Sequence, residues 1–284
     1  MTNAIHVLST KPYTVSRNNP RFQQDDFEVV STVLSALTWQ KHNGSIKFFT
    51  DIKGAEYYNS LGLLDLWEGG VDTTTVENIS NRIDQHIFWA SAKLFALMSV
   101  HSPIAIIDTD LIVWKNLDSF FDNSCLTVLH REALIDCYLP KRQLKIPPGY
   151  DFNPNWNWRV WPCNTALAFF NDDNFKNYYL GQAVEFMTGN LERPQDLISQ
   201  MVFVEQRLLA MCAKEKGISI STLVKTPFQK SNTLFTHLWG AKSIARHNPV
   251  QRERLIRSMM SKIQLISLDF HDRLVKCLDL KINY

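Results

Sequence analysis

The sequence lacks an apolar run long enough to cross a bilayer, which takes about 20 consecutive apolar residues. The longest candidate, residues 94–107, is interrupted by His101 and Pro103. Residues 1–4 also lack the basic segment, followed by a long apolar one, that marks a signal peptide. These absences predict a cytoplasmic protein.

Clustered cysteines and an excess of charge are absent as well. The five cysteines are scattered, and no CxxC pair or Cys/His cluster occurs, which argues against a structural zinc site. Isolated cysteines suit a reducing compartment. The formal net charge is only +2, so we expect no nucleic-acid partner.

The first fifty residues predict a strand–helix–strand unit. Residues 4–8 and 46–50 are short apolar runs, and between them Val30, Val33 and Leu37 recur at helical spacing. This order predicts an α/β protein with parallel strands. Further helices and strands are expected at about 54–61, 83–98, 104–107, 125–129, 165–170, 197–215 and 249–280, with a break near 265–268.

Two aspartates directly follow an apolar strand. Residues 104–107 read Ile-Ala-Ile-Ile, and Asp108 and Asp110 come next. Ligands of open α/β sheets bind beyond the carboxyl ends of the strands. Two carboxylates there, with no cation between them in sequence, repel each other, and a hard divalent cation would reverse that penalty. The alternative is a pair of aspartates that caps backbone amides at the end of a strand.

A second polar motif follows much later in the chain. His237 offers an imidazole that can bind a metal, Gly240 lets backbone approach a ligand, and Lys242 supplies a charge suited to phosphate. The alternative is a histidine that simply packs beside Trp239. The functional interpretation requires this loop to fold back onto the two aspartates.

In chain order, these motifs resemble the nucleotide-sugar glycosyltransferases of GT-A fold, most closely glycosyltransferase family 8 and its relatives. The DxD motif of that family is matched by Asp108 and Asp110. Its HxxGxxK motif is matched by His237, Gly240 and Lys242.

Three weaker matches support the same resemblance. The Asn-small-Gly strand start of the family is matched in part by Asn164, although Ala166 replaces its glycine. Its Asp-Gln pair is matched by Glu205 and Gln206, with glutamate in place of aspartate. A basic residue before the DxD strand is matched by Lys93.

The likeness covers about residues 4–245 and implies a fold. We expect a GT-A type, Rossmann-like mixed sheet flanked by helices, with further helices at the C-terminal end. The expected organisation is a single glycosyltransferase domain over residues 1–284, with a catalytic core at 1–245 and a helical extension at 246–284.

The resemblance also implies a hexosyltransferase-like activity of the kind that serves polysaccharide biosynthesis. A sugar would pass from a nucleotide diphosphate sugar, with a UDP-sugar expected, to a glycan or lipid-linked acceptor, with retention of anomeric configuration. Mn²⁺ or Mg²⁺ would be held by Asp108, Asp110 and His237. Gln206 would lie under the reacting carbon, and Glu205 would bind sugar hydroxyls.

The resemblance also implies which residues bind the diphosphate and which bind the nucleoside of the donor. Lys242 and Gly240 would bind the diphosphate, and Thr10 and Tyr13 the base and ribose. The residues implied for donor binding are Lys242, Gly240, Lys93, Thr10, Tyr13 and Asn164.

Two other functions stay open. A phosphohydrolase of the haloacid dehalogenase type also places DxD after an apolar strand, but its motif continues with Gly and then Thr or Val, whereas Leu111 and Ile112 follow here. An inactive protein that binds nucleotide sugars would keep the same motifs, and the replacement of glycine by Ala166 keeps that alternative open.

Two segments have alternative interpretations. Trp156, Trp158 and Trp161 lie among asparagines in the loop 153–162, where they either pack into the core or offer aromatic faces to an acceptor sugar. The C-terminal helix either packs one face on the protein or makes peripheral contact with the inner face of a membrane. Its basic residues are Arg252, Arg254, Arg257 and Lys262.

Overall fold

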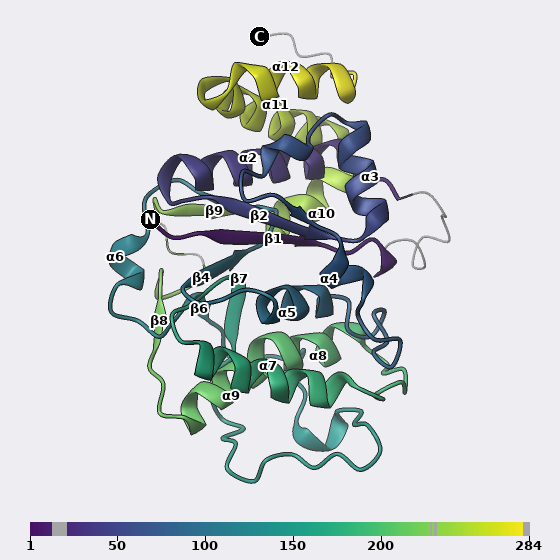
Figure 1. Cartoon of the computed structure of the whole chain (residues 1–284), viewed down its shortest axis with the longest axis vertical. Coiled ribbons are helices and arrows are strands. Elements are labelled where there is room, and N and C mark those ends of the chain that lie inside the picture. Colours follow the sequence, from purple (N-terminus) through teal and green to yellow (C-terminus); the bar gives the residue numbers. More distant parts are fainter. Residues whose placement is uncertain (13–21, 228, 230–231, 281–284) are drawn as a thin grey trace.

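The chain folds around a mixed seven-stranded sheet (Figure 1). The computed structural model describes residues 1–12, 22–227, 229 and 232–280. The strands of this sheet are β1 (Ala4–Leu8), β2 (Ile46–Thr50), β3 (Val71–Asp72), β4 (Ile104–Ile107), β6 (Leu126–Arg131), β7 (Cys163–Phe170) and β8 (Ile220–Thr222). Their order is β3-β2-β1-β4-β7-β6-β8.

Strand direction makes the sheet mixed. β1 runs parallel to β2 and to β4, whereas β7 runs antiparallel to both β4 and β6. β4 and β6 therefore run in the same direction, and their carboxyl ends lie at the same edge. A separate two-stranded sheet pairs β5 (Leu111–Val113) with β9 (Phe235–His237).

Helices cover both faces of the main sheet (Figure 1). One side carries α2 (Asp26–His42), α10 (Trp239–His247), α11 (Pro249–Ile266) and α12 (Leu268–Cys277). The other carries α5 (Ser91–Met98), α7 (Asp173–Met187), α8 (Leu197–Val202) and α9 (Leu208–Glu215). Shorter helices are α3 (Ile52–Ser60), α4 (Thr74–Glu77), α6 (Asp118–Phe121) and the 3₁₀ turns Leu64–Leu66 and Lys141–Gln143.

The expected fold class is confirmed: an α/β protein with a mixed sheet flanked by helices and with helices at the C-terminal end. The apolar run at 104–107 forms β4, and all four of its residues are buried between β1 and β7. A strand that is covered on both faces needs such a continuous apolar run. The predicted break in the C-terminal helical region also exists, because α11 ends at Ile266 and α12 begins at Leu268.

One helix prediction is wrong in part, and another is confirmed in its bounds but contains an irregular turn. The helix expected at 83–98 begins only at Ser91, because Asp84 Oδ1 accepts from the backbone N–H of His86 (2.8 Å) and Ile87 (3.4 Å) and holds a turn. The helix expected at 197–215 is interrupted by a π turn over Phe203–Arg207. Such turns recur at functional sites.

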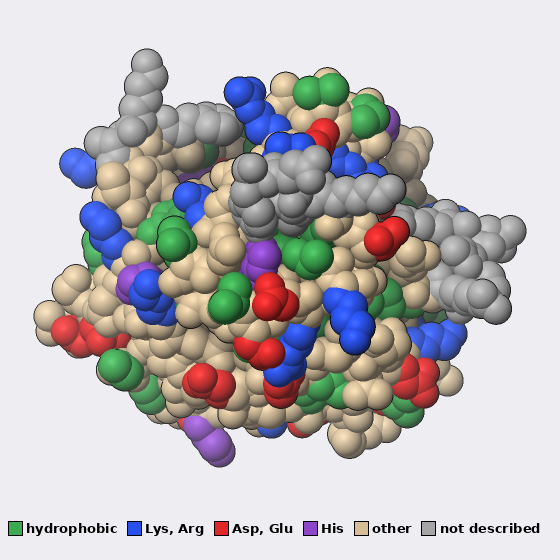
Figure 2. Space-filling model, turned by 90° about the horizontal axis from the view of Figure 1, so that it is seen from above, with side chains coloured by type: hydrophobic (Ala, Val, Ile, Leu, Met, Phe, Trp, Pro, Cys, Tyr) green, Lys and Arg blue, Asp and Glu red, His purple; other side chains and the backbone are tan. Residues whose placement is uncertain are grey.

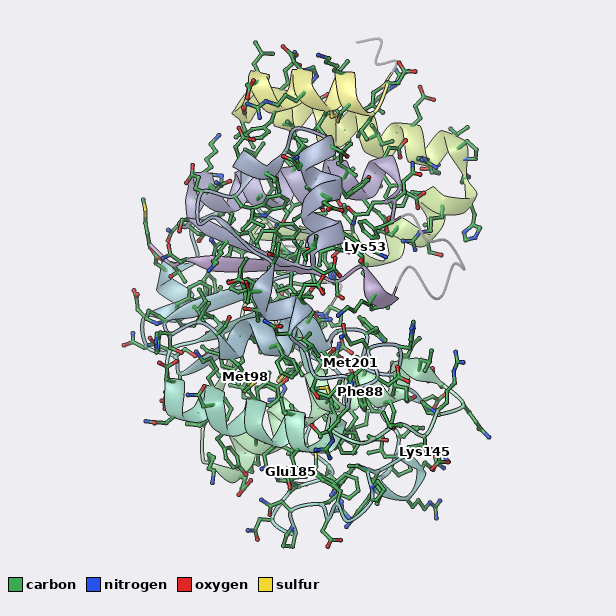
Figure 3. The ribbon with its side chains drawn as sticks, turned by 45° about the vertical axis from the view of Figure 1, so that its right-hand side comes forward. Lys53, Phe88, Met98, Lys145, Glu185 and Met201 are labelled. Atoms are coloured by element: carbon green, nitrogen blue, oxygen red, sulfur yellow. The ribbon has the colours of Figure 1, made fainter. Side chains whose placement is uncertain are left out.

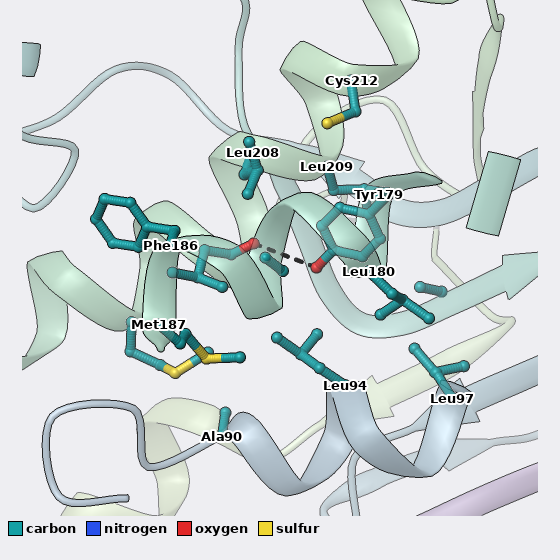
Figure 4. Close-up of a cluster of buried hydrophobic side chains, with 14 of the residues drawn as sticks. Ala90, Leu94, Leu97, Tyr179, Leu180, Phe186, Met187, Leu208, Leu209 and Cys212 are labelled. Atoms are coloured by element: carbon teal, nitrogen blue, oxygen red, sulfur yellow. Dashed lines mark hydrogen bonds between the residues drawn. The ribbon is translucent and has the colours of Figure 1, made fainter. Parts of the chain in front are cut away.

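Buried side chains support this π turn from the layer below the sheet. Phe88 and Met201 are buried there (Figure 3), whereas Glu185 of α7 in the same layer is exposed, as is Lys53 of α3 across the sheet. Tyr179 lies among leucines (Figure 4), and its hydroxyl contacts the carbonyl oxygens of Val204 (3.2 Å) and Glu205 (3.1 Å).

Two side chains of the tryptophan-rich loop pack against the core. Trp156 is buried and donates to Glu215 Oε2 (3.0 Å), and the ring of Trp158 stacks on that of Phe203 at 5.7 Å between centroids. Trp161 is 57% exposed. The core interpretation therefore holds for the first two tryptophans, and Trp161 alone of the three is free to face an acceptor.

α11 packs on α2, α12 packs on α11, and two arginines of α11 form ion pairs. Arg252 pairs with Asp26 (2.8 Å), and Arg257 pairs with Glu253 (2.5 Å). Basic and acidic side chains are interspersed on the face seen from above (Figure 2). Among the described residues, no helix combines the length and apolar character needed to cross a bilayer.

Candidate metal and phosphate site

Asp108 and Asp110 lie in the turn that leads from β4 into β5. The N–H of Asp108 donates to the carbonyl oxygen of Ala166 (2.8 Å), and the N–H of Leu111 donates to that of Asp108 (2.9 Å). The first bond extends the pairing of β4 with β7, and the second closes the turn that takes the chain out of the main sheet. Both carboxylates consequently lie just beyond the carboxyl end of β4.

The pairing of β5 with β9 brings His237 to this turn. Leu111 lies opposite His237 in the antiparallel register, and the N–H of Leu238 donates to the carbonyl oxygen of Asp110 (3.1 Å). One ligand atom each from Asp108, Asp110 and His237 lies within 4.8 Å of the others. The structure thus brings together the three residues that the sequence singled out as metal ligands.

Two lysines also reach these carboxylates. Lys93 Nζ lies 2.7 Å from Asp108 Oδ1 and also pairs with Glu205. Lys242 Nζ lies 2.7 Å from Asp110 Oδ2. No cation lies between the two aspartates in sequence, and both lysines come from distant parts of the chain. Three carboxylates facing two ammonium groups still leave the cluster acidic.

The charge states in this cluster follow from these pairs. Burial would raise the pKa of Asp108, but Lys93 and then His237 outweigh it and hold that pKa below its ordinary value. Burial would lower the pKa of Lys93, but Asp108 and Glu205 raise it above its ordinary value. Asp108 is therefore ionised at neutral pH, the form in which a carboxylate binds a metal.

The start of α10 adds an open helix N-terminus beside His237. A Cβ at Gly240 would meet no heavy atom of the described chain within 4 Å. Nothing in the local packing therefore requires glycine, whereas close approach of a ligand would. The first N–H groups of a helix bind anions such as phosphate, and Lys242 lies on the first turn of the same helix.

The residues expected to hold the nucleoside lie at the end of β1. Thr10 is buried, and both its N–H (2.6 Å) and its hydroxyl (3.0 Å) donate to Asp51 Oδ2. These bonds fix the strand end to the start of α3, so contact of Thr10 with a nucleotide stays a prediction. Tyr13 lies outside the described residues.

The residues expected near the sugar form a hydrogen-bonded group. Asn164 Nδ2 donates to Glu132 Oε1 (2.7 Å), and the N–H of Ala166 donates to Asn164 Oδ1 (3.1 Å). Tyr138 Oη lies 2.5 Å from Glu132 Oε2 and 2.5 Å from Gln206 Oε1. Asn164 and Gln206 are thus joined through two residues that the sequence analysis missed.

A sequence signal exists for one of these two residues. Glu132 follows the apolar strand β6, just as Asp108 follows β4. Because β4 and β6 run in the same direction, the rule that singled out Asp108 applies equally to Glu132. Tyr138 lies in an irregular loop, where no periodicity marks a site residue.

Comparison with known proteins gives a family. The sequence matches the profile of DUF6734, described as a family of unknown function, over residues 6–250. The chain belongs to this family. Among curated proteins, none matches this DUF6734 sequence significantly. Membership of glycosyltransferase family 8 stays a prediction.

Several solved structures are similar to this DUF6734 protein. The apo form of glycosyltransferase GlyE from Streptococcus pneumoniae TIGR4 shares 13% identity over 77% of this chain and 44% of that chain, with a TM-score of 0.41. Apo mouse xyloside xylosyltransferase 1 shares 10% over 82% and 90%, with a TM-score of 0.39. Galactosyltransferase LgtC with donor and acceptor sugar analogs shares 10% over 72% and 70%, with a TM-score of 0.36.

These similarities are too distant to carry function. All three identities are below 25% and all three TM-scores are below 0.5. The DUF6734 chain also spans less than half the length of the GlyE structure that it matches. A functional assignment therefore has to rest on the chemistry of the site itself.

Proposed function

We propose that this protein transfers a sugar from a nucleotide diphosphate sugar to a glycan or lipid-linked acceptor. The convergence of Asp108, Asp110 and His237 carries the proposal. Carboxylate oxygens suit Mg²⁺ and Mn²⁺, and the imidazole is a further ligand for a transition metal, so the three donors fit Mn²⁺ best. When bound, such a cation supplies Lewis-acid stabilisation of the departing diphosphate.

The residues of the chain itself would supply a second phosphate contact. A cation on Asp110 competes with Lys242 for that carboxylate, which frees the ammonium group for phosphate. Lys242 and the N-terminus of α10 then act together on the same negative charge. The absence of packing around Gly240 supports this arrangement, because it leaves room for a ligand against the backbone.

The finer expectations belong to the same proposal. Gln206 would face the reacting carbon and Glu205 the sugar hydroxyls, with retention of configuration and a UDP-sugar as donor. Lys93 and Asn164 would order this side of the site, and Thr10 the nucleoside side. Peripheral membrane contact stays a prediction, which the ion pairs of Arg252 and Arg257 do not favour.

The test is metal-dependent nucleotide binding by wild-type protein and by Asp110→Asn. A ligand at 100 times its Kd stabilises the native state by about 2.7 kcal/mol. We therefore expect UDP or GDP with Mn²⁺ to raise Tm by several degrees in the wild type, and EDTA to reverse the shift. Asp110→Asn should abolish the shift, whereas the exposed control Asp122→Asn should keep it.

An unchanged shift in Asp110→Asn would remove the metal role. Absence of any nucleotide shift in the wild type, together with hydrolysis of a generic phosphate ester, would instead support the phosphohydrolase alternative. Slow release of free sugar from a stabilising donor would separate an active transferase from an inactive binding protein.

A further inference from the structure

A chain of hydrogen bonds runs from β7 to Gln206. The N–H of Ala166 donates to Asn164 Oδ1 (3.1 Å), which orients that amide so that its Nδ2 donates to Glu132 Oε1 (2.7 Å). The other oxygen of Glu132 lies 2.5 Å from Tyr138 Oη. Tyr138 Oη in turn lies 2.5 Å from Gln206 Oε1. The four side chains Asn164, Glu132, Tyr138 and Gln206 form one continuous relay.

Tyr138 has one proton for two neighbouring acceptors. A phenol donates a single hydrogen bond, and a bond to an ionised carboxylate is about twice as strong as one between neutral groups. The proton of Tyr138 therefore goes to Glu132, which also accepts from Asn164. Burial, followed by the neighbouring Glu132, raises the pKa of Tyr138 above its ordinary value, so the phenol stays protonated. The oxygen of Tyr138 is left able only to accept.

We propose that the Gln206 amide is turned so that its nitrogen donates to Tyr138 and its carbonyl oxygen faces the open side of the site. Glu132 and Tyr138 are then positioning residues that set this orientation. The two ends of a glutamine amide are assigned from the hydrogen bonds they make, and this relay permits one assignment. The inference rests on the proposed function, because it specifies how Gln206 would meet the donor sugar.

The amide end that points away from Tyr138 is free to meet a ligand. It makes no hydrogen bond with any residue in the described part of the chain, and it is not among the buried unpaired atoms. Gln206 is also the one partly exposed residue of its π turn. A substrate can therefore reach this end of the side chain.

The segments that carry Tyr138 and Gln206 are held in place by further hydrogen bonds. Arg207 Nη1 donates to the carbonyl oxygens of Tyr138 (3.1 Å) and Leu139 (2.6 Å), and its Nη2 donates to that of Trp158 (2.6 Å). The hydroxyl of Tyr179 supports the π turn from below. Because both segments are anchored, they cannot easily move to accommodate a different amide. The direction of the hydrogen bonds in the relay therefore sets the orientation of the Gln206 amide.

The orientation matters because the two ends of the amide carry opposite partial charges. Glycosyl transfer develops positive charge at the anomeric carbon. A carbonyl oxygen there stabilises that charge, whereas an amide N–H₂ opposes it. Glu132 therefore determines, through Tyr138, whether the carbonyl oxygen or the amide nitrogen of Gln206 faces the sugar.

Glu132→Gln tests this assignment without breaking the relay. The new amide oxygen accepts from Asn164 and its nitrogen donates to Tyr138, whose proton then goes to Gln206 Oε1. Every bond is satisfied, so we expect Tm and Mn²⁺-dependent UDP binding to be unchanged. Gln206 Nε2 now faces the open site, and its side-chain hydrogen exchange should become faster by about tenfold or more.

The readout is the side-chain signal of Gln206 in protein labelled with ¹⁵N-glutamine, identified by its loss in Gln206→Asn. Tyr138→Phe removes the accepting oxygen and should accelerate exchange in the same way. Glu215→Gln is the matched control, since it alters another Tyr–Glu pair, with Tyr178 Oη 2.6 Å from Glu215 Oε2, away from Gln206. With an active donor, Glu132→Gln should lower kcat about tenfold or more and leave the KM for donor within about twofold.

Equal exchange of Gln206 Nε2 in the wild type and in Glu132→Gln would overturn the assignment. That result is independent of whether any nucleotide binds, because exchange is measured on the free protein. Absence of UDP binding in the wild type would instead defeat the proposed function and leave the amide orientation to be judged by exchange alone.

Discussion

At the scale of single residues, each carboxylate of the site already has a cationic partner. Lys93 joins Asp108 to Glu205, and Lys242 holds Asp110. Each of these acids is thus paired with a lysine in the free protein, which lets buried acids persist without an ion. In the proposed function, a metal ion would have to displace these lysines, and the displaced ammonium groups would then be available to phosphates.

Lys242→Ala should separate phosphate binding from nucleoside binding. A hydrogen bond to a charged group contributes about 1.5–3 kcal/mol, so we expect the Kd for UDP with Mn²⁺ to rise by about tenfold or more. Binding of uridine should change by less than about twofold, because the lysine reaches only the phosphates. Isothermal titration measures both, with the exposed Lys214→Ala as control. Equal losses for UDP and uridine would show that Lys242 does not touch phosphate.

At the scale of elements, a buried histidine joins β1, α2 and β5. Trp67 Nε1 donates to His6 Nδ1 (3.3 Å), so the proton of His6 is on Nε2, which donates to Ser35 Oγ (3.1 Å). Ser35 Oγ donates to the carbonyl oxygen of Leu111 (2.5 Å). Because Leu111 lies opposite His237, this network fixes the strand that carries the site.

His6 should make stability depend on acid. Burial lowers the pKa of His6 from 6.5 to about 3, with Asp108 opposing the shift in part. Below pH 6.5 the imidazole of His6 is therefore protonated in the unfolded chain, whereas in the folded chain it stays neutral down to about pH 3. Stability is full above pH 6.5 and should fall by up to about 1.4 kcal/mol per pH unit below it.

Urea unfolding of the wild type and His6→Gln at pH 7.5 and 5.0 measures this effect. Glutamine can keep both hydrogen bonds and does not titrate, so the variant should lose less stability between the two pH values. Parallel losses in both proteins would assign the acid sensitivity to other groups, such as His130, whose pKa burial also lowers.

The sequence predicted the elements whose pattern is local. The runs at 4–8, 46–50 and 104–107 became strands because each is apolar enough to be covered on both faces. The turn set by Asp84 and the π turn at Phe203–Arg207 were missed, because side-chain bonds and packing override helical periodicity there.

For the site as well, the sequence predicted what depends on local motifs and missed what depends on tertiary contacts. Asp108, Asp110 and His237 could be found from motif order, and the structure brings them together. Lys93 meets Asp108, and Glu132 meets Asn164, only through tertiary structure, so no spacing revealed those contacts.

At the scale of the whole molecule, the C-terminal helices share one core with the rest of the chain. α11 buries Ile256, Met259, Met260 and Ile263 in the cluster that also contains much of α2. Arg246 and Arg252 pair with acids at the start of α2. The core at 1–245 and the extension at 246–284 are therefore proposed to be one cooperative unit.

A chain truncated after residue 248 tests this unity. Full burial of an aliphatic or methionine side chain stabilises a fold by about 1.5–3 kcal/mol, so loss of the four from α11 approaches the 5–15 kcal/mol of a typical domain. We expect no cooperative unfolding transition in the truncated chain by circular dichroism. A sharp transition close to that of the full chain would show that the first part folds alone.

The pairing of β5 with β9 sets an order of events during translation. The ribosome releases Asp108 and Asp110 more than a hundred residues before His237. Until β9 has been synthesised and has paired with β5, the imidazole of His237 cannot lie beside the two aspartates of the nascent chain. The unfinished polypeptide consequently cannot bring the three side chains together, and the proposed metal centre would be completed only after all seven strands of the main sheet have been synthesised.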